Sequence, residues 1–181
     1  DIFERAYRGE LRQGAVKGLA DVSMQTEESY ISKVDAVLDG NLSERAVIEI
    51  GETPDVFLNL GVPQWPIATT GGVIEKAHYD HGLLRDTLKN LPIHLADPVM
   101  VFESDTMSGS YVAVIDKFER NLPVVVAIHP NKELGRIEIN FVASAYPKDR
   151  PSSIQNWIKS GLLRYINKSK SRSWATTAKL Q

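Results

Sequence analysis

The hydrophobic pattern of this chain changes its period close to residue 99, and this change limits the possible folds. Before it, apolar residues recur at intervals of three to four, which predicts helices; after it, short apolar or alternating runs predict strands. Helices followed by strands favour an α+β fold over an α/β fold. We therefore expect N-terminal helices packed on a four-stranded antiparallel sheet, followed by a helix and a basic C-terminal segment.

The predicted helices of the first half are bounded by capping residues and helix breakers. Thr26 is a favourable N-cap residue, and Gly40 is a typical signal for the end of the same helix. Thr53 is expected to cap a two-turn helix, and Leu91-Pro92 to stop the next one. The helices are predicted over residues 2–20, from Thr26 to Gly40, from Pro54 to Gly61, and from Gly82 to Asn90.

The second half is predicted to form an antiparallel meander. Its connections, such as residues 119–122, are too short for parallel crossovers. A separate short strand is expected at residues 46–50, a loop at 63–72, and a hairpin turn at 129–130. After the meander, a helix is expected over residues 152–162, with Trp157 and Ile158 on its inner side. The four strands of the meander are predicted at residues 99–102, 111–115, 123–128 and 136–143.

Length and composition narrow the class of protein. The 181 residues suit one domain, which we expect over residues 46–181, with residues 1–45 as a helical cap or linker. Because cysteine is absent, disulfides and thiol nucleophiles are excluded. We expect no signal peptide, and the sequence contains no run of about 18 apolar residues and no phosphate-binding glycine loop. The chain does not begin with Met, so we expect it to come from a longer protein.

Charge is distributed unevenly along the chain. Residues 147–181 contain eight basic residues and one acidic residue, a local charge of +7. The remaining residues contain 13 basic and 22 acidic side chains, a charge of −9. A steep division of this kind is typical of a chain whose basic end contacts a polyanion, although a solvated basic tail would look the same.

The first candidate cluster contains Lys76, His78 and His81, at the start of the predicted helix. Exposed backbone N–H groups at such a position favour phosphate. Two histidines and a lysine are what metal-free RNA cleavage needs, because imidazoles transfer protons near neutral pH and a lysine stabilises the charged phosphorane. Alternatively, one histidine caps the helix and the other is merely exposed. Zinc, with His94 and Asp97 as further ligands, is a weaker alternative without any cysteine.

The second candidate cluster, Ser144, Tyr146 and Lys148, follows the alternating strand. Side chains two residues apart lie on the same face of a strand, so a hydroxyl, a phenol and an amine would point the same way. Such groups can hold a phosphate and stack a base. The alternative is a strand end that runs into a solvated loop, because Pro147 limits strand pairing.

The third candidate cluster combines basic and aromatic residues at the C-terminal end. Interleaved charges and rings suit a nucleic-acid strand. The alternative is that Tyr165, Ile166 and Trp174 belong to the core and that the charges are solvated. The candidate RNA-binding residues are Arg150, Arg164, Tyr165, Lys168, Lys170, Arg172 and Trp174.

Several fragments, taken in order, resemble a known family. They are Ile50-Gly51-Glu52-Thr53-Pro54, Leu60-Gly61, Lys76-Ala77-His78, His81-Gly82-Leu83, Leu91-Pro92, the run from Asp97 to Phe102, the run from Ser144 to Lys148, and the run from Gly161 to Lys168. Together they resemble the C-terminal toxin domains of phage MuF-type polymorphic toxins, similar to members of the barnase/EndoU/RelE-like nuclease superfamily. The resemblance covers roughly residues 48–174.

This resemblance implies a function as well as a fold. It implies a metal-independent endoribonuclease toxin that needs no cofactor, attacks RNA through the 2′-hydroxyl and leaves a cyclic phosphate. It also implies delivery within a larger protein, action in the bacterial cytoplasm, and neutralisation by a cognate immunity protein. The alternative is a non-enzymatic module that binds nucleic acid or a partner. The positions that match the residue types of the superfamily's active sites are Lys76, His78, His81, Ser144, Tyr146 and Lys148.

Overall fold

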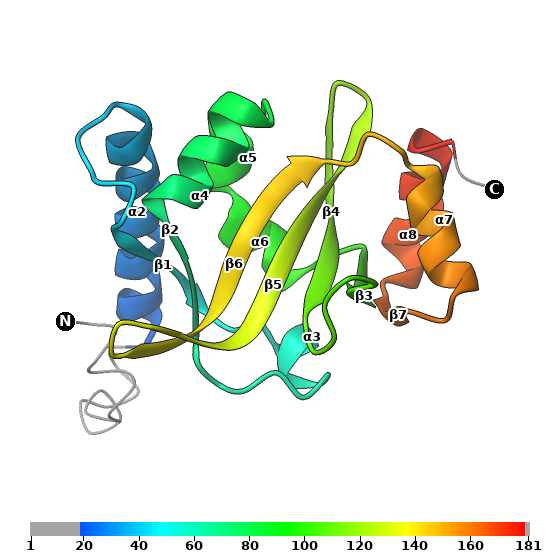
Figure 1. Ribbon diagram of the computed structural model, residues 1–181, viewed down its shortest axis with the longest axis horizontal. Helices are drawn as coiled ribbons and strands as arrows, with labels where there is room; N and C mark the ends of the chain where they lie inside the picture. Colours follow the sequence, from blue (N-terminus) through cyan, green and yellow to red (C-terminus); the bar gives the residue numbers. More distant parts are fainter. Residues whose placement is uncertain (1–18, 180–181) are drawn as a thin grey trace.

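The computed structural model describes residues 19–179 as a curved sheet with helices at both ends and over its faces (Figure 1). The helix predicted over residues 2–20 lies almost entirely outside the described residues. Within them, no helix is long and apolar enough to span a membrane. The fold is α+β, as predicted, but its sheet is larger than expected.

Between residues 19 and 179 the sheet has seven strands in the order β1-β2-β6-β5-β4-β3-β7, so the prediction of four is too small. The predicted meander forms the middle of this sheet and is antiparallel throughout. Two strands add to one side of it and one strand to the other. The strands are β1 (Val47–Glu52), β2 (Pro66–Thr70), β3 (Met100–Glu103), β4 (Tyr111–Glu119), β5 (Leu122–Leu134), β6 (Ile137–Pro147) and β7 (Leu163–Ile166).

Two strands were missed because their sequences carry little of the usual signal. β2 lies in the segment predicted as a loop, and its three central residues are all buried, so polar and apolar residues do not alternate. It joins β6 in parallel through only two residue pairs. β7 alternates half-buried and exposed residues, but it is four residues long and lies within the basic end. Short strands of this kind are defined by their neighbours more than by their own sequence.

One residue pair predicted as a turn belongs to a strand. His129 and Pro130 lie within β5, where the pairing with β6 shifts register between His129 and Lys132. The irregularity accommodates Pro130, which has no N–H for the ladder. The imidazole Nδ1 of His129 lies 2.7 Å from the hydroxyl oxygen of Ser110.

The helices are shorter than predicted, except the first described one. α2 begins at Leu19, so Thr26 lies inside this helix and does not cap it. The helix α5 ends at Lys89, just before Leu91-Pro92, as predicted, but this pair also begins a further helix, at a position where proline is tolerated because its N–H would have no partner. The helices are α2 (Leu19–Leu38), α3 (Asp55–Leu58), α4 (Gly71–Glu75), the π-helix η2 (Lys76–Asp80), α5 (Arg85–Lys89), α6 (Leu91–Ala96), α7 (Ser152–Lys159) and α8 (Lys168–Thr177).

Thr53 anchors a loop and does not cap α3 as predicted. Pro54 occupies the N-cap position, and α3 is a single turn. The Thr53 hydroxyl donates to the carbonyl of Trp65 at 2.5 Å and accepts from the side-chain amide of Asn140 at 2.8 Å. Asn140 is fully buried in β6, and it also donates to the carbonyl of Pro63. The segment 53–65, which contains α3, is therefore fixed against the middle of β6.

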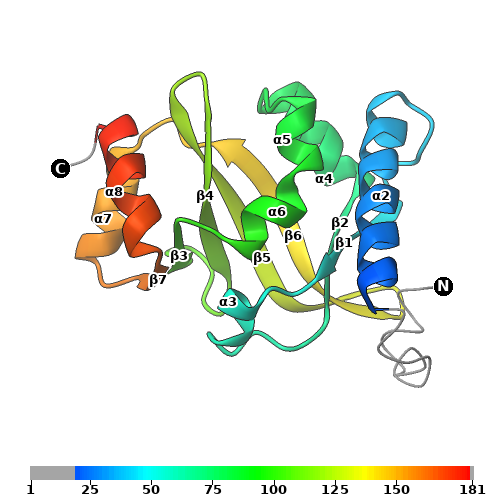
Figure 2. The same ribbon diagram turned by 180° about the vertical axis from the view of Figure 1, so that it is seen from behind.

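The sheet is buried on both faces where β5 crosses it. Val124 and Val126 pack into the main core with Tyr30 of α2, whereas Val125 packs on the opposite face with Trp174 of α8. Figure 2 shows α5 and α6 over the first face, with α7 and α8 at the other end of the molecule. Because α2 contributes Tyr30, Val34 and Val37 to the main core, its described part packs with residues 46–179.

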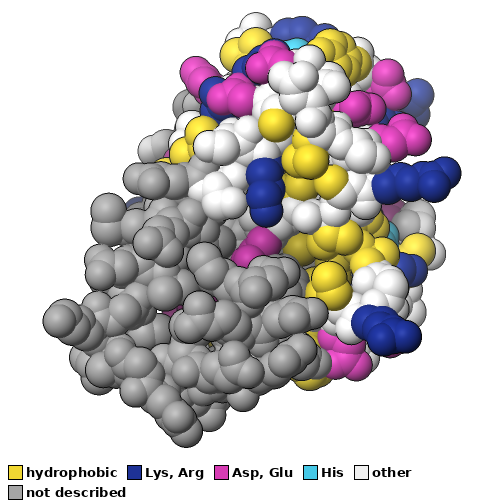
Figure 3. Space-filling model, turned by 90° about the vertical axis from the view of Figure 1, so that its left-hand side faces the viewer, with side chains coloured by type: hydrophobic (Ala, Val, Ile, Leu, Met, Phe, Trp, Pro, Cys, Tyr) yellow, Lys and Arg dark blue, Asp and Glu magenta, His cyan; other side chains and the backbone are white. Residues whose placement is uncertain are grey.

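Ion pairs join α2 to α5 on the surface. Arg85 contacts Asp35 and Asp39, each at 3.0 Å, and Lys89 contacts Asp35 at 2.9 Å. Figure 3 shows the visible face at this end of the molecule, on which acidic and basic side chains are interspersed. These carboxylates are therefore neutralised locally, and each exposed pair contributes little to stability.

Candidate functional site

The first predicted cluster lies at the end of a helical segment and not at its start. Thr70 caps α4 by accepting a hydrogen bond from the backbone N–H of Val73 at 3.4 Å, and α4 continues directly into η2. Lys76 and His81 therefore lie at the C-terminal end, where carbonyl groups and a negative dipole favour cations. The predicted position of this cluster at a helix N-terminus is wrong, so a helix N-terminus cannot contribute to phosphate binding here.

The error arose from the glycine pair that precedes the cluster. Gly71-Gly72 suggested a loop, but both residues are helical. A Cβ atom at Gly71 would collide with the backbone carbonyl of Ser43. Glycine is needed here because two chain segments approach closely, a requirement that depends on the tertiary structure.

The helical segment ends in a π-turn at His81. The N–H of His81 donates to the carbonyl of Lys76 at 2.9 Å, five residues earlier, in place of the usual four. Gly82 then adopts a positive φ of 73°, which reverses the chain. A π-turn contains one residue more than an α-turn, so it takes up an extra residue while the side chains before and after it keep their directions.

The two histidines of the cluster have different environments. His78 packs edge-on against Tyr79, and its Nδ1 lies 2.7 Å from the carbonyl oxygen of Leu83, so it fixes the chain after the π-turn. Tyr79 in turn donates to the carbonyl of Leu38 at 2.7 Å. His81 is half-buried and points to β6, where its ring centre lies 5.7 Å from that of Tyr146.

A pocket of about 250 Å³ joins the first two clusters. Lys76 and His81 line it from the helical segment, and Ser144 lines it from β6. Tyr146, two residues further along β6, contacts His81 beside the pocket. Ser144 and Tyr146, which were predicted to share one face of the strand, thus both lie close to His81. We call this cavity the His81 pocket; its lining residues are Thr70, Gly72, Val73, Lys76, His81, Ala143, Ser144 and Ala145.

The β4–β5 hairpin holds the backbone around His81. Arg120 and Asn121 have φ values of 51° and 63°, as in the tight turns that suit antiparallel hairpins. The Arg120 guanidinium donates to the carbonyl of His81 at 3.0 Å. Its neighbour Glu119 is buried and accepts hydrogen bonds from the N–H of Leu84 and the hydroxyl of Thr87. Sequence patterns identified this turn but not its contacts, because those contacts join segments far apart in the chain.

Tyr146 and Lys148 extend the site towards α7. The ammonium of Lys148 lies 6.0 Å from the centre of the Tyr146 ring and 5.5 Å from that of Trp157. Burial raises the pKa of the Tyr146 phenol, and the carboxylates of Asp105 and Asp149 raise it further. Tyr146 therefore stays protonated at neutral pH and can donate a hydrogen bond.

The six predicted catalytic residues, Lys76, His78, His81, Ser144, Tyr146 and Lys148, fall within one family match. A family model described as the phage MuF-C-terminal domain matches residues 73–173, more than half of the chain. This protein belongs to the phage MuF C-terminal domain family. No match is found among curated proteins or among solved structures. The predicted relationship to MuF-type proteins is confirmed, whereas the relationship to toxins and nucleases stays a prediction.

Several side chains in the basic end of this MuF C-terminal domain form contacts within the domain. Arg164 pairs with Glu103 at 2.5 Å, and Lys170 pairs with Asp97 at 2.8 Å. Trp174 is 2% exposed and packs against Phe118, so its ring faces the core, as the alternative interpretation expected. Tyr165 is half-buried against the main core. The predicted RNA-binding side chains that are exposed, basic and outside these two ion pairs are those of Arg150, Lys168 and Arg172.

The possible zinc ligands do not come together in the MuF C-terminal domain. His94 lies on α6, where burial, together with the nearby Lys117, lowers its pKa. Asp97 is paired with Lys170. Across the described part of the chain, no group of three or more His, Cys, Asp or Glu side chains is placed to hold a metal ion.

Proposed function

We propose that this domain is a metal-independent endoribonuclease in which the 2′-hydroxyl of RNA attacks the adjacent phosphate and leaves a cyclic phosphate. The observation that carries the proposal is the His81 pocket, where Lys76 and His81 of the helical segment meet Ser144 of β6 beside Tyr146. A base, a cation and two hydroxyl groups around one small cavity are the groups that phosphoryl transfer without metal requires.

His81 is assigned the removal of the 2′-hydroxyl proton. Imidazole is suited to proton transfer near neutral pH, and this ring is half-buried beside the pocket. Arg120 holds the backbone of His81 in place through its carbonyl. This contact matters because even a small displacement of a catalytic group lowers the reaction rate strongly.

Lys76 and Ser144 are assigned the binding of the phosphate. Both line the pocket, and Lys76 forms no ion pair with any described residue. An ammonium and a hydroxyl can donate to the non-bridging oxygens as negative charge builds up on the phosphorane. Lys148 lies farther along, beside Tyr146 and Trp157, where it suits the phosphate of a neighbouring nucleotide.

Tyr146 is assigned the protonation of the leaving group. The 2′-oxygen forms a bond to phosphorus while the bond to the 5′-oxygen breaks, and the departing oxygen takes the phenolic proton. The imidazolium of His81, whose ring centre is 5.7 Å from that of the phenol, then returns a proton to Tyr146. Each proton removed from the 2′-hydroxyl is thus delivered to the 5′-oxygen. His78 is assigned a positioning role, because its contact with Leu83 fixes the turn after His81.

We further propose that the domain acts as a toxin in the bacterial cytoplasm after delivery within a larger phage-type protein, with a cognate immunity protein as its inhibitor. Membership of the MuF C-terminal domain family supports the phage connection. The exposed basic residues Arg150, Lys168 and Arg172 would bind RNA, and an acidic inhibitor could compete for them.

The test is incubation of the purified chain with total bacterial RNA in EDTA, beside His81→Ala and His78→Ala variants. We expect the wild type to cleave RNA to cyclic phosphates, and His81→Ala to be slower by about 10²–10⁴. His78→Ala should retain more activity per folded molecule, because its ring contacts the backbone and not the pocket.

Two controls separate the alternatives. An oligonucleotide with a single 2′-deoxy position at the cleaved bond should remain intact, because it lacks the attacking hydroxyl. Intact RNA in every lane, together with binding that weakens at high salt, would contradict the proposal and favour the nucleic-acid-binding module instead.

A further inference from the structure

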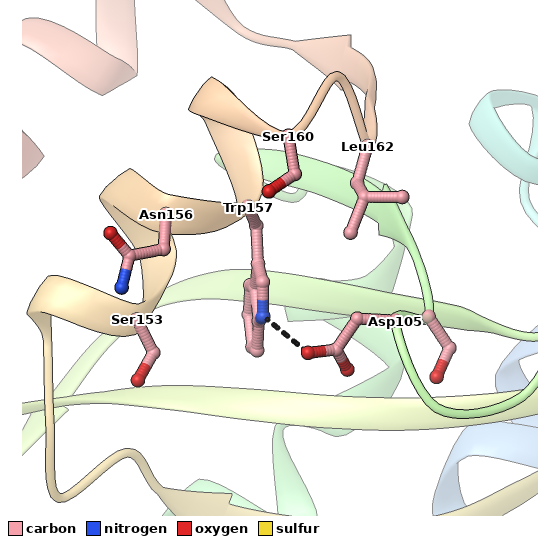
Figure 4. Close-up of a pocket in the computed structure, with 7 residues that line it drawn as sticks. Asp105, Ser153, Asn156, Trp157, Ser160 and Leu162 are labelled. Carbon is pink, nitrogen blue, oxygen red and sulfur yellow. Dashed lines mark hydrogen bonds between the residues drawn. The ribbon is translucent and has the colours of Figure 1, made fainter.

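A second pocket, of about 420 Å³, lies between the β3–β4 loop and α7 (Figure 4). Its volume is in the range of about 300–1,000 Å³ that is usual for small-ligand sites. None of its lining residues has a role in the proposed chemistry. We call it the Trp157 pocket; it is lined by Ser104, Asp105, Ser153, Asn156, Trp157, Ser160 and Leu162.

Trp157 is held in one orientation at this pocket. Its indole N–H donates to the Asp105 carboxylate at 3.2 Å, as Figure 4 shows. The ring of Phe102 meets it edge-on with centres 5.3 Å apart, and the Lys148 ammonium lies 5.5 Å from its centre. A fixed indole loses little conformational entropy when a ligand binds, which favours recognition.

Asp105 sets the hydrogen-bonding character of the pocket. It is the one ionisable side chain among the described lining residues, and it is exposed on its loop. An ionised carboxylate only accepts hydrogen bonds, and it accepts several, so the bond from Trp157 leaves further capacity. The other polar lining residues, Ser153, Asn156 and Ser160, carry groups that both donate and accept.

The Trp157 pocket is joined to the His81 pocket by a line of side chains. His81 contacts Tyr146, and the Lys148 ammonium lies beside both the Tyr146 ring and the Trp157 ring. Tyr146 and Lys148 are two residues apart in the chain, at the end of β6. A nucleic-acid strand that places a phosphate at Lys148 would therefore bring a base to Trp157.

We propose that the Trp157 pocket binds a nucleobase of the RNA substrate and favours bases that carry an exocyclic amino group. The proposal rests on the proposed ribonuclease function for its substrate class. Cytosine, adenine and guanine can donate from the amino group to Asp105, as a carboxylate accepts from the amino group of cytosine elsewhere. Uracil presents carbonyl oxygens on either side of its single N–H, and these repel a carboxylate.

Cytidine and uridine 5′-monophosphates provide the test, because they differ only at one edge of the base. Binding to the full chain carrying His81→Ala is followed through the indole N–H resonance of Trp157, assigned with Trp157→Phe. We expect cytidine monophosphate to shift this resonance and to bind at least about fivefold more tightly than uridine monophosphate. Equal binding of the two nucleotides, or no shift with either, would overturn the proposal.

Asp105→Asn tests whether the carboxylate causes the preference for cytidine monophosphate over uridine monophosphate. The amide oxygen can still accept from Trp157, but the new N–H₂ group can donate to uracil, so the preference should fall to within about twofold. The matched control is Asp149→Asn, which removes the same charge from another exposed residue near Tyr146 and should keep the preference. A preference that survives Asp105→Asn would also overturn the proposal.

The outcomes separate this proposal from the ribonuclease function. If the chain cleaves RNA through His81 but neither nucleotide shifts Trp157, the base pocket is wrong and the nuclease stands. If cytidine monophosphate binds selectively through Asp105 but RNA is never cleaved, the pocket stands and the nuclease is wrong.

Discussion

The His81 pocket and the basic segment, residues 164–174, both combine lysine, a hydroxyl group and an aromatic ring, but these groups contact different things. In the basic segment, Lys170 pairs with Asp97 and Trp174 packs into the core. In the His81 pocket, Lys76 is exposed at a cavity and His81 turns its ring to Tyr146. The difference teaches that residue types alone do not define a site, because what matters is whether their polar atoms are already engaged.

The largest expected difference between the two regions is in activity. His81→Ala should slow RNA cleavage by about 10²–10⁴, because it removes a proton-transfer group. Lys170→Ala should leave cleavage within about twofold, because it breaks only an exposed ion pair. Initial rates on a fluorescent oligonucleotide measure both. A larger loss for Lys170→Ala than for His81→Ala would reverse the comparison.

The next effect is on stability and concerns the basic segment. Trp174→Ala should lower the free energy of unfolding by roughly 3–5 kcal/mol, because it leaves a cavity against Phe118. Trp174→Phe should cost less, since the lost indole N–H has no hydrogen-bond partner among the described residues. Urea denaturation measures both variants. A near-neutral Trp174→Ala that instead weakens RNA binding would restore the predicted surface role.

A smaller effect, on both stability and activity, is expected where the β4–β5 hairpin contacts the backbone of His81. Gly82→Ala should cost about 1–2 kcal/mol of stability, because an L-residue is strained at the positive φ of this position. The added methyl group would also press on the Arg120 guanidinium that holds the His81 carbonyl. Activity per folded molecule should therefore fall as well. Gly135→Ala, at a positive φ with open space around it, is the matched control and should affect stability alone.

The smallest effect is a pH dependence of stability near the basic segment. Burial, with help from Lys117 and Lys170, lowers the pKa of His94 in the folded state. The unfolded chain thus binds the proton more tightly, so stability is complete above the ordinary histidine pKa of about 6.5 and is lost as the pH falls through the lowered value. Urea midpoints from about pH 8 to about pH 5 should fall less for His94→Gln than for the wild type. Parallel curves for the two proteins would contradict this.

Much of the fold follows from local patterns, and the rest depends on contacts between distant segments. β4, β5 and β6 were predicted because they are long enough to show apolar runs or alternation, and β3, although only four residues long, because its residues form an apolar run. β2 was missed because its burial comes from pairing with β1 and β6. The start of α4 was missed because Gly71 is required by its close approach to the backbone of Ser43, which the neighbouring sequence does not indicate.

The candidate site could be predicted in its parts but not in its assembly. The expectation that Ser144 and Tyr146 share one face follows from the period of a strand. The contact of His81 with Tyr146 depends on the packing of η2 against β6, which no local pattern indicates. Trp157 and Ile158 were expected on the inner side of α7, but Ile158 is 43% exposed. The bond of Trp157 to Asp105 joins residues that are 52 positions apart.

The π-turn before His81 has a consequence for the ancestry of the pocket. Such a turn is one residue longer than a regular helical turn, so it takes up an extra residue while the side chains before and after it keep their directions. Loss of a single codon from η2 would restore the ordinary ladder, and the N–H of His81 would still meet the carbonyl of Lys76. In evolutionary terms, the helical segment can gain or lose one residue at this point without turning the imidazole away from β6.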